Sequence, residues 1–283
     1  MTQPPLLAPD PPWLPELLGA LAEHDCLAVH QLAPLLGRLP EDVAPILDRL
    51  ARDRHVQVLE AAATRSKAYA LNVRGARLLA ELTGEEPVPV GRTRSTAILD
   101  HELVKNDLAV VLQLLDAMGR IELLRWETSR DVLADAVHVI RGKRTERVAL
   151  VADGLAVIAT PTGPTALLVE IDMGTVSLSR MTTKYAGYAA WWKAKGPERR
   201  FGLRSLRVLT IAKHEARMVR LRAAAAEAAG TEAHGLFWFA TADVLDADAP
   251  EKLLAPRFWT AKPDMDSTSI LPNVATPDGA PAA

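Results

Sequence analysis

Between residues 13 and 84, the spacing of apolar residues changes from the period of a helix to that of a strand and back again. Helical spacing predicts three helices, over residues 13–23, 29–36 and 41–53. Alternation then predicts the two strands of a hairpin, around Val56 and Val58 and around Tyr69 and Leu71. A further helix is predicted over residues 72–82. This order is that of a winged helix-turn-helix, in which a hairpin called the wing follows the recognition helix.

The rest of the chain predicts a second domain that mixes helices and strands. A long helix comes first, over residues 101–118. The strands are predicted over residues 121–128, 151–160, 166–172, 206–212 and 235–241. Two more helices are predicted between the later strands, over residues 177–195 and 214–229. Consecutive strands followed by helical crossovers imply a mixed sheet flanked by helices, so the fold class is α/β (α+β).

Local composition sets the expected domain boundaries. Prolines crowd the start of the chain, and Pro, Asp, Ser, Thr and Ala dominate its end, which favours disorder in both segments. Two prolines, two glycines and two arginines in residues 83–96 are typical of a linker. The expected organisation is a disordered segment over 1–12, a winged helix over 13–84, a linker over 85–97, an α/β domain over 98–261 and a disordered tail over 262–283.

Composition excludes several classes of protein. The net charge is -2, so any nucleic-acid site must be a local patch. The single cysteine, Cys26, excludes an internal disulfide framework and a Cys-rich zinc site. The first residues do not have the pattern of a signal peptide, and no apolar run is as long as we expect for a membrane span. The sequence also lacks the motifs of a phosphate-binding loop and a dinucleotide-binding fold. We therefore expect a cytoplasmic protein that has no membrane partner.

A local excess of positive charge marks the predicted recognition helix and wing. Residues 38–77 hold eight basic and five acidic side chains. Arg49 and Arg52 are expected to face outward together and lie nearest the DNA bases. Arg65 and Lys67 fall at the wing tip, where such hairpins contact phosphates. The predicted DNA-binding residues are therefore Arg49, Arg52, Arg54, Arg65 and Lys67. The alternative is a winged helix that makes only protein contacts or dimerises.

Three carboxylates form the second candidate site. Glu170 and Asp172 are two residues apart in a predicted strand, so they project from the same face, and Asp153 lies on the preceding strand. Such a cluster needs a cation or a proton, and Mg²⁺ prefers oxygen ligands. The predicted metal ligands are Asp153, Glu170 and Asp172, and Lys184 is their basic partner. The alternative is that Asp172 and Asp153 stabilise turns.

Basic and aromatic residues alternate in the predicted helix that follows these strands. Four of its aromatic and sulfur-containing residues share a helical face and are expected in the core: Met181, Tyr185, Tyr188 and Trp192. Beyond them lie four basic residues, which fit either a nucleic-acid surface or a solvated helix end: Lys193, Lys195, Arg199 and Arg200. In the next predicted helix, over 214–229, Arg217, Arg220 and Arg222 are expected at the surface.

Taken together, these motifs resemble the replication-relaxation family of bacterial, often plasmid-borne proteins. The family pattern of a His-x-Leu-x-x-Asn-Asp helix falls on His101, Leu103, Asn106 and Asp107. A Pro-Asp-Gly strand matches residues 152–154, with Ala152 in place of proline. A Glu-x-Asp strand and a Lys-x-x-x-Tyr helix fall on Glu170, Asp172, Lys184 and Tyr188. The resemblance covers roughly residues 13–245.

The resemblance implies a winged helix joined to a core similar to the restriction-endonuclease-like fold. The expected function is DNA binding in plasmid replication, mobilisation or transcriptional control, without catalysis. The alternative is a Mg²⁺-dependent nuclease or nickase in which Asp153, Glu170, Asp172 and Lys184 are catalytic. Asp172 occupies the place of that fold's usual lysine, which Lys184 would then replace. A relaxase or replication protein is an expected partner besides double-stranded DNA, and a homodimer is expected.

Overall fold

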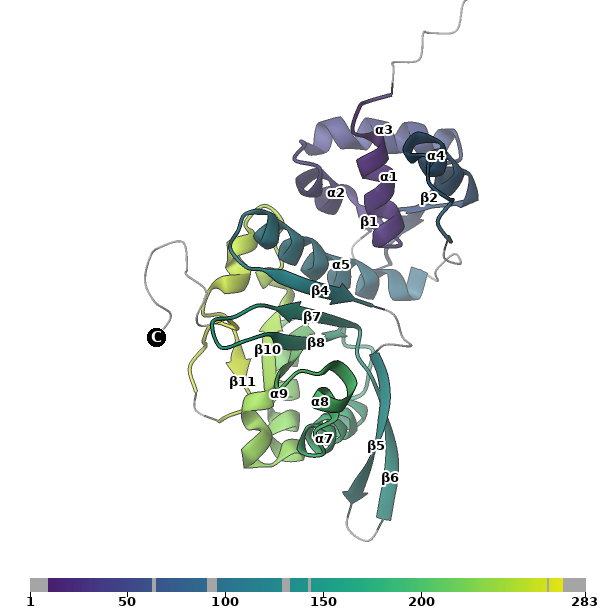
Figure 1. The fold of residues 1–283 in the computed structure, drawn as a ribbon. Helices are drawn as coiled ribbons and strands as arrows, with labels where there is room; N and C mark the ends of the chain where they lie inside the picture. Colours follow the sequence, from purple (N-terminus) through teal and green to yellow (C-terminus); the bar gives the residue numbers. More distant parts are fainter. Residues whose placement is uncertain are drawn as a thin grey trace, which may run out of the picture. The chain divides into compact units, whose positions relative to one another are not determined.

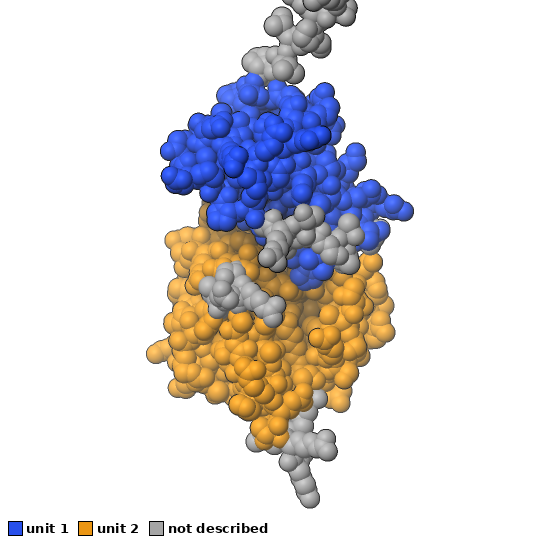
Figure 2. All heavy atoms as spheres, turned by 90° about the vertical axis from the view of Figure 1, so that its right-hand side faces the viewer, with its two compact units in different colours: residues 1–106 blue, residues 107–283 orange. Residues whose placement is uncertain are grey.

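The computed structural model describes residues 10–62, 65–90, 96–128, 133–141, 144–263 and 265–271. The chain divides into two compact units, Met1–Asn106 and Asp107–Ala283 (Figure 2). The division falls inside the long helix α5 (Thr96–Ala117), whereas composition placed it in a linker over 85–97. Residues 1–9 of the expected N-terminal disordered segment and 91–95 of the expected linker lie outside the described residues.

Unit 1 contains the predicted helices and hairpin together with a short strand that was not predicted. Its elements are α1 (Leu14–Glu23), β1 (Leu27–Ala28), α2 (Val29–Leu35), α3 (Pro40–Arg52), β2 (Val56–Glu60), β3 (Lys67–Leu71) and α4 (Val73–Thr83). Strand β3 lies between β1 and β2 in an antiparallel sheet. Apolar residues at helical spacing bury one face of α1, as the pattern predicted.

Local sequence explains the limits of α4. The Asn72 side chain accepts hydrogen bonds from the backbone N–H groups of Arg74 and Gly75, which would otherwise lack partners at the helix start. Its amide also donates to the Arg54 carbonyl at 2.8 Å and so holds the turn before β2. Gly84 ends the helix in the left-handed conformation that glycine adopts without steric cost. These contacts fix α4 beside the hairpin.

The sheet of unit 2 is mixed, as predicted. Its strands are β4 (Leu123–Glu127), β7 (Gly154–Ile158), β8 (Thr165–Asp172), β9 (Ser205–Ala212), β10 (Phe237–Thr241) and β11 (Trp259–Thr260). They lie in the order β11-β10-β9-β8-β7-β4. The pairs β8–β9 and β9–β10 are parallel, and the other pairs are antiparallel. The prediction of an α/β chain with a mixed sheet is therefore confirmed.

Two helices cover one face of this sheet (Figure 1). The crossover from β8 to β9 contains α7 (Leu178–Lys193) and the short α8 (Gly196–Phe201), and the crossover from β9 to β10 contains α9 (Glu215–Ala229). Both crossovers run in the same direction along the sheet, so their common handedness puts both helices on one side. A core of buried side chains from α7, α9 and the strands fills this layer. Every residue of β8 is buried, so the opposite face is covered as well.

A separate hairpin, β5 (Ala134–Arg141) with β6 (Arg144–Val151), was not predicted. It packs against α7, where Gly187 lets Val148 and Leu150 approach closely. The single strand predicted over 151–160 was therefore wrong at its start, because Val151 ends β6 and β7 begins at Gly154. The break falls at Asp153, where the alternative interpretation of that residue had placed a turn.

The C-terminal segment differs from the expected disordered tail. Ile270 and Leu271 are buried, and Phe258 exchanges backbone hydrogen bonds with Thr268. The Ser269 hydroxyl donates to the Leu254 carbonyl at 2.8 Å. The part of the predicted tail beyond residue 271 lies outside the described residues. Three short 3-10 helices connect the last strands: Thr231–Leu236, Ala242–Val244 and Pro250–Leu254. Within the described ranges, no helix combines the length and apolarity needed to cross a membrane.

Candidate functional site

The carboxylates of β8 lie on the face of the sheet that α7 and α9 cover. Glu170 and Asp172 share this face with Ala166 and Leu168, which belong to the core beneath the two helices. Both carboxylates are almost completely buried. An ionised carboxylate in such a position needs a partner that donates protons or carries positive charge. The structure supplies different partners to each of them.

Glu170 is held by two residues of α7. The Lys184 ammonium lies 2.5 Å from Glu170 Oε2, and the Tyr188 hydroxyl donates to Oε1. Lys184 also donates to the Val151 carbonyl at 2.8 Å, so it links β8, α7 and the end of β6. Lys184 and Tyr188 are four residues apart, which puts them on one side of the helix. Burial raises the pKa of Glu170 to about 7, although Lys184 opposes the shift.

Asp153 stands beside this pair, in the turn between β6 and β7. Its Oδ2 accepts the backbone N–H of Ile171 at 2.8 Å, and its own N–H donates to the Val169 carbonyl. Its charge adds to the upward shift in the pKa of Glu170. The structure thus brings together Asp153, Glu170 and Lys184, as the sequence predicted, and adds Tyr188. We call these four residues the Glu170 cluster.

Asp172 belongs to a different arrangement. The Arg217 guanidinium of α9 binds it through both oxygens, with Nε to Oδ1 and Nη2 to Oδ2 each at 2.8 Å. The N–H of Gly174 donates to Oδ1 at 2.9 Å, and Arg217 also bonds the Val176 carbonyl. This planar, two-point pairing is the strongest that a carboxylate makes with a side chain. Asp172 therefore fastens the turn after β8 to α9, as the turn alternative anticipated.

The predicted set of three metal ligands is not assembled. Asp172 is neutralised by Arg217, and Glu170 by Lys184 and Tyr188. Across the part of the chain that the structure describes, no group of three or more His, Cys, Asp or Glu side chains is placed to hold a metal ion. The residues present therefore do not fit a Mg²⁺ site built from these three carboxylates. Chemically, the Glu170 cluster can hold and exchange a proton near neutral pH.

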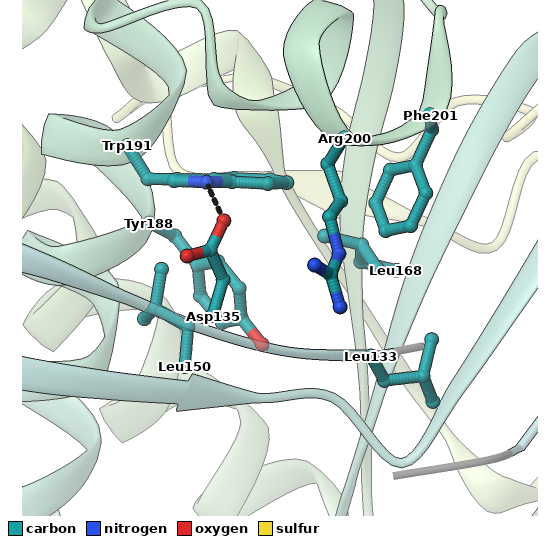
Figure 3. A pocket seen from close by; sticks show the side chains of 8 residues that line it. All are labelled: Leu133, Asp135, Leu150, Leu168, Tyr188, Trp191, Arg200 and Phe201. Atoms are coloured by element: carbon teal, nitrogen blue, oxygen red, sulfur yellow. Dashed lines mark hydrogen bonds between the residues drawn. The ribbon is translucent and has the colours of Figure 1, made fainter. Parts of the chain in front are cut away.

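A small pocket lies beside the cluster, between the β5–β6 hairpin, α7 and α8 (Figure 3). The Trp191 indole donates to Asp135 Oδ2 at 2.8 Å, and Arg200 points into the pocket from α8. The pocket is partly open, and the space within it that the centre of a water molecule can reach is about 10 Å³, which is room for about one water. The pocket is therefore too small for a metabolite or a nucleotide.

The predicted DNA-binding residues of unit 1 differ in exposure. Arg49 is only 14% exposed at its side chain and pairs with Asp10 at 2.5 Å, so it does not face outward with Arg52. That prediction was wrong, because α3 turns Arg49 towards the chain that precedes α1. Arg52, Arg54, Arg65 and Lys67 are exposed. Arg65 lies beside Glu60 across the hairpin, with 3.3 Å between the nearest atoms.

Residues in the middle of α5 serve a structural role within unit 1. The buried Asn106 amide donates to the carbonyls of His24 and Cys26, at 3.2 and 2.7 Å. Gln31 of α2 donates to the Leu103 carbonyl at 2.9 Å. Leu103 packs in a small core that includes the buried Cys26. The Leu and Asn positions of the His-x-Leu-x-x-Asn pattern thus fasten the middle of α5 to α2 and to the segment between α1 and β1.

Two residues that bind the carboxylates of β8 were not predicted to do so from the sequence. Tyr188 was expected in the core, and it is buried, but its hydroxyl also binds Glu170. The four-residue spacing from Lys184 was the available signal. Arg217 was expected at the surface, and that prediction was wrong, because it is buried against Asp172. Nothing in the local pattern of α9 separates Arg217 from the exposed Arg220.

A family model described as replication-relaxation matches residues 18–205, which is most of the chain and includes parts of both units. No curated protein and no solved structure matches. The matched range contains the start of α5, the Glu170 cluster and Asp172. This chain belongs to the replication-relaxation family.

Proposed function

We propose that this protein binds duplex DNA through unit 1, which acts as a winged helix. Membership in the replication-relaxation family fits a role in plasmid replication or mobilisation. The observation that carries the proposal is the order α1-β1-α2-α3-β2-β3-α4, in which the β2–β3 hairpin directly follows α3 and pairs with β1. In winged helix-turn-helix proteins this hairpin is the wing beside the recognition helix.

Charge on the surface of unit 1 limits how the DNA can approach. The exposed side of α3 carries Glu41, Asp42 and Asp48, which repel phosphates along most of the helix. Positive charge is concentrated elsewhere, at the end of α3 and on the hairpin: Arg52, Arg54, Arg65 and Lys67. We therefore place the phosphate contacts at the C-terminal end of α3 and on the wing, and Arg49 takes no part.

We propose that this function involves no DNA cleavage. A metal-dependent nuclease needs carboxylates that are free to bind the metal. Both oxygens of Asp172 accept hydrogen bonds from Arg217, and those of Glu170 accept from Lys184 and Tyr188. This pairing supports a structural role for both carboxylates. The expected homodimer and the relaxase or replication partners stay predictions.

The test is the affinity for a duplex taken from the protein's own gene neighbourhood, measured by fluorescence anisotropy. We expect Arg65→Gln/Lys67→Gln to weaken binding on the order of tenfold and to lower the slope of log Kd against log salt by about 1.8. The control is Lys213→Gln/Arg220→Gln, which removes two exposed charges of unit 2. Equal affinity and slope for the wing variant and the wild type would overturn the proposal, as would the absence of salt-sensitive binding.

A further inference from the structure

Positive charge also gathers on unit 2, where α7 ends and α8 begins. Four exposed basic residues lie within ten positions of one another: Lys195, Arg199, Arg200 and Arg204. Glu198 is the acidic residue within this stretch. We call these four basic residues the α8 surface. Such a density of positive charge contrasts with the net charge of -2 for the whole chain.

The backbone beneath the α8 surface is tightly fixed. A Cβ added at Gly196 would lie 2.1 Å from Trp191 Nε1, so only glycine lets α8 approach the indole. Phe201 packs edge-on against the same ring, with 6.2 Å between the centroids. The indole is also held by its Nε1–H, which donates to Asp135 Oδ2 (Figure 3). Lys195, Arg199 and Arg204 are therefore exposed on an ordered corner of the fold, and Arg200 points into the pocket beside it.

Only some of these basic residues stabilise the ends of α7 and α8. Lys193 complements the end of α7 and pairs with Glu232, and Arg199 donates to the Ala194 carbonyl at the same helix end. Lys195 and Arg204 have no ionic or hydrogen-bond partner for their side chains among the residues that the structure describes. They remain available to a ligand outside the chain.

The chemistry of the α8 surface favours phosphates. Lysine and arginine side chains bind the phosphate backbone of nucleic acids, and this binding requires no apolar contact. A membrane-binding surface would add large exposed apolar side chains to its positive charge. The large exposed apolar residues of the described chain lie elsewhere, and none falls between Lys193 and Arg204.

We propose that the α8 surface is a second contact for the phosphate backbone of duplex DNA. This inference rests on the proposed function, because it assigns unit 2 a part in the same binding event. The wing would supply one set of phosphate contacts, and the α8 surface a second set on the same duplex. Two separated contacts lengthen the bound segment of DNA and steepen the dependence of affinity on salt.

The test compares three double variants of the full chain on one duplex across about 50 to 200 mM salt. Lys195→Gln/Arg204→Gln removes the two unpaired charges of the α8 surface; Lys195 is the N-cap residue of α8, but its side chain makes no capping hydrogen bond. Arg65→Gln/Lys67→Gln removes the charges of the wing, and Lys213→Gln/Arg220→Gln is the charge-matched control. Thermal unfolding confirms that each variant is folded. Sedimentation with vesicles that contain an anionic phospholipid runs in parallel.

We expect the α8 variant to weaken DNA binding on the order of tenfold and to lower the salt slope by about 1.8, while the control changes neither. If only the wing variant weakens binding, the α8 inference is wrong and the proposed function stands. If the wild type shows no salt-sensitive binding, both are wrong. If the α8 variant binds DNA normally but no longer sediments with vesicles, the surface contacts lipid and the inference fails.

Discussion

Glu170 shows how a single buried carboxyl can link the sheet to a helix. It bonds Lys184 and Tyr188 of α7, and Lys184 continues to the Val151 carbonyl at the end of β6. Burial of the carboxyl favours its neutral form and raises its pKa to about 7. Three elements therefore meet at a group whose charge changes near neutral pH.

This shift predicts a pH-dependent stability. Between pH 4.5 and about 7 the unfolded chain releases the Glu170 proton while the folded protein keeps it. The free energy of unfolding should therefore fall as the pH rises through this window, by about 3 kcal/mol from this group. Urea unfolding measured at both ends of this pH window should show that the free energy of unfolding falls less in Glu170→Gln than in the wild type. The control is Glu81→Gln, which removes an exposed carboxyl. An identical pH dependence in Glu170→Gln and the wild type would refute the assignment.

The Asp172–Arg217 pair predicts a larger effect when one partner is removed. Arg217→Met leaves a buried carboxylate without its guanidinium, which should cost about 3 to 5 kcal/mol of unfolding free energy. Arg220→Met, on the exposed side of the same helix, should change stability by less than about 0.5 kcal/mol. Urea unfolding measures both. The structural role of the pair is wrong if the two variants are equally stable.

At the scale of elements, the junction of α7 and α8 depends on the absence of a side chain at Gly196. A methyl group there would collide with the rigid indole of Trp191, so Gly196→Ala should destabilise the protein by about 1 to 3 kcal/mol. Gly19 is the matched control, because it lies inside α1 with open space around its Cα. Gly19→Ala should stabilise by about 0.5 to 1 kcal/mol, since alanine favours a helix. Thermal unfolding that ranks the two variants the other way would contradict this packing.

The attachment of α5 to β1 is testable in the same way. Asn106→Leu removes the donor that serves the His24 and Cys26 carbonyls, and the His24 carbonyl then keeps only weaker support from the Cys26 N–H in the same turn. The expected loss is about 1 to 3 kcal/mol. Hydrogen exchange should show reduced protection around β1 and the start of α5. Unchanged protection in this variant would mean that Asn106 does not hold the two elements together.

The sequence predicts most of the elements because periodicity reports which side of an element is buried. The prediction is wrong where contacts with distant parts of the chain determine the local structure. The β5–β6 hairpin is held by its contact with α7, a helix that comes later in the chain. Ile270 and Leu271 are two apolar residues in a polar, proline-rich stretch, so composition alone predicts disorder where the structure has packing.

At the scale of the whole molecule, the sequence could predict which polar residues gather but not how they pair. The two-residue spacing in β8 correctly places Glu170 and Asp172 on one face. The two carboxylates have different partners because the crossovers place both α7 and α9 over that face: Glu170 pairs with a residue of α7, and Asp172 with a residue of α9. The prediction that Arg49 faces outward was wrong for a similar reason, because its partner Asp10 is distant in sequence. The family match then connects these arrangements to replication-relaxation proteins.

A single gel assay tests whether this protein binds DNA without cutting it. Supercoiled plasmid that carries the gene neighbourhood is incubated with the protein and Mg²⁺ or Mn²⁺, and Asp153→Asn/Glu170→Gln is run beside the wild type. We expect intact plasmid in a retarded band that disappears as salt is raised. Nicked or linear plasmid that forms with the wild type and is absent with the variant would contradict it and identify a nuclease.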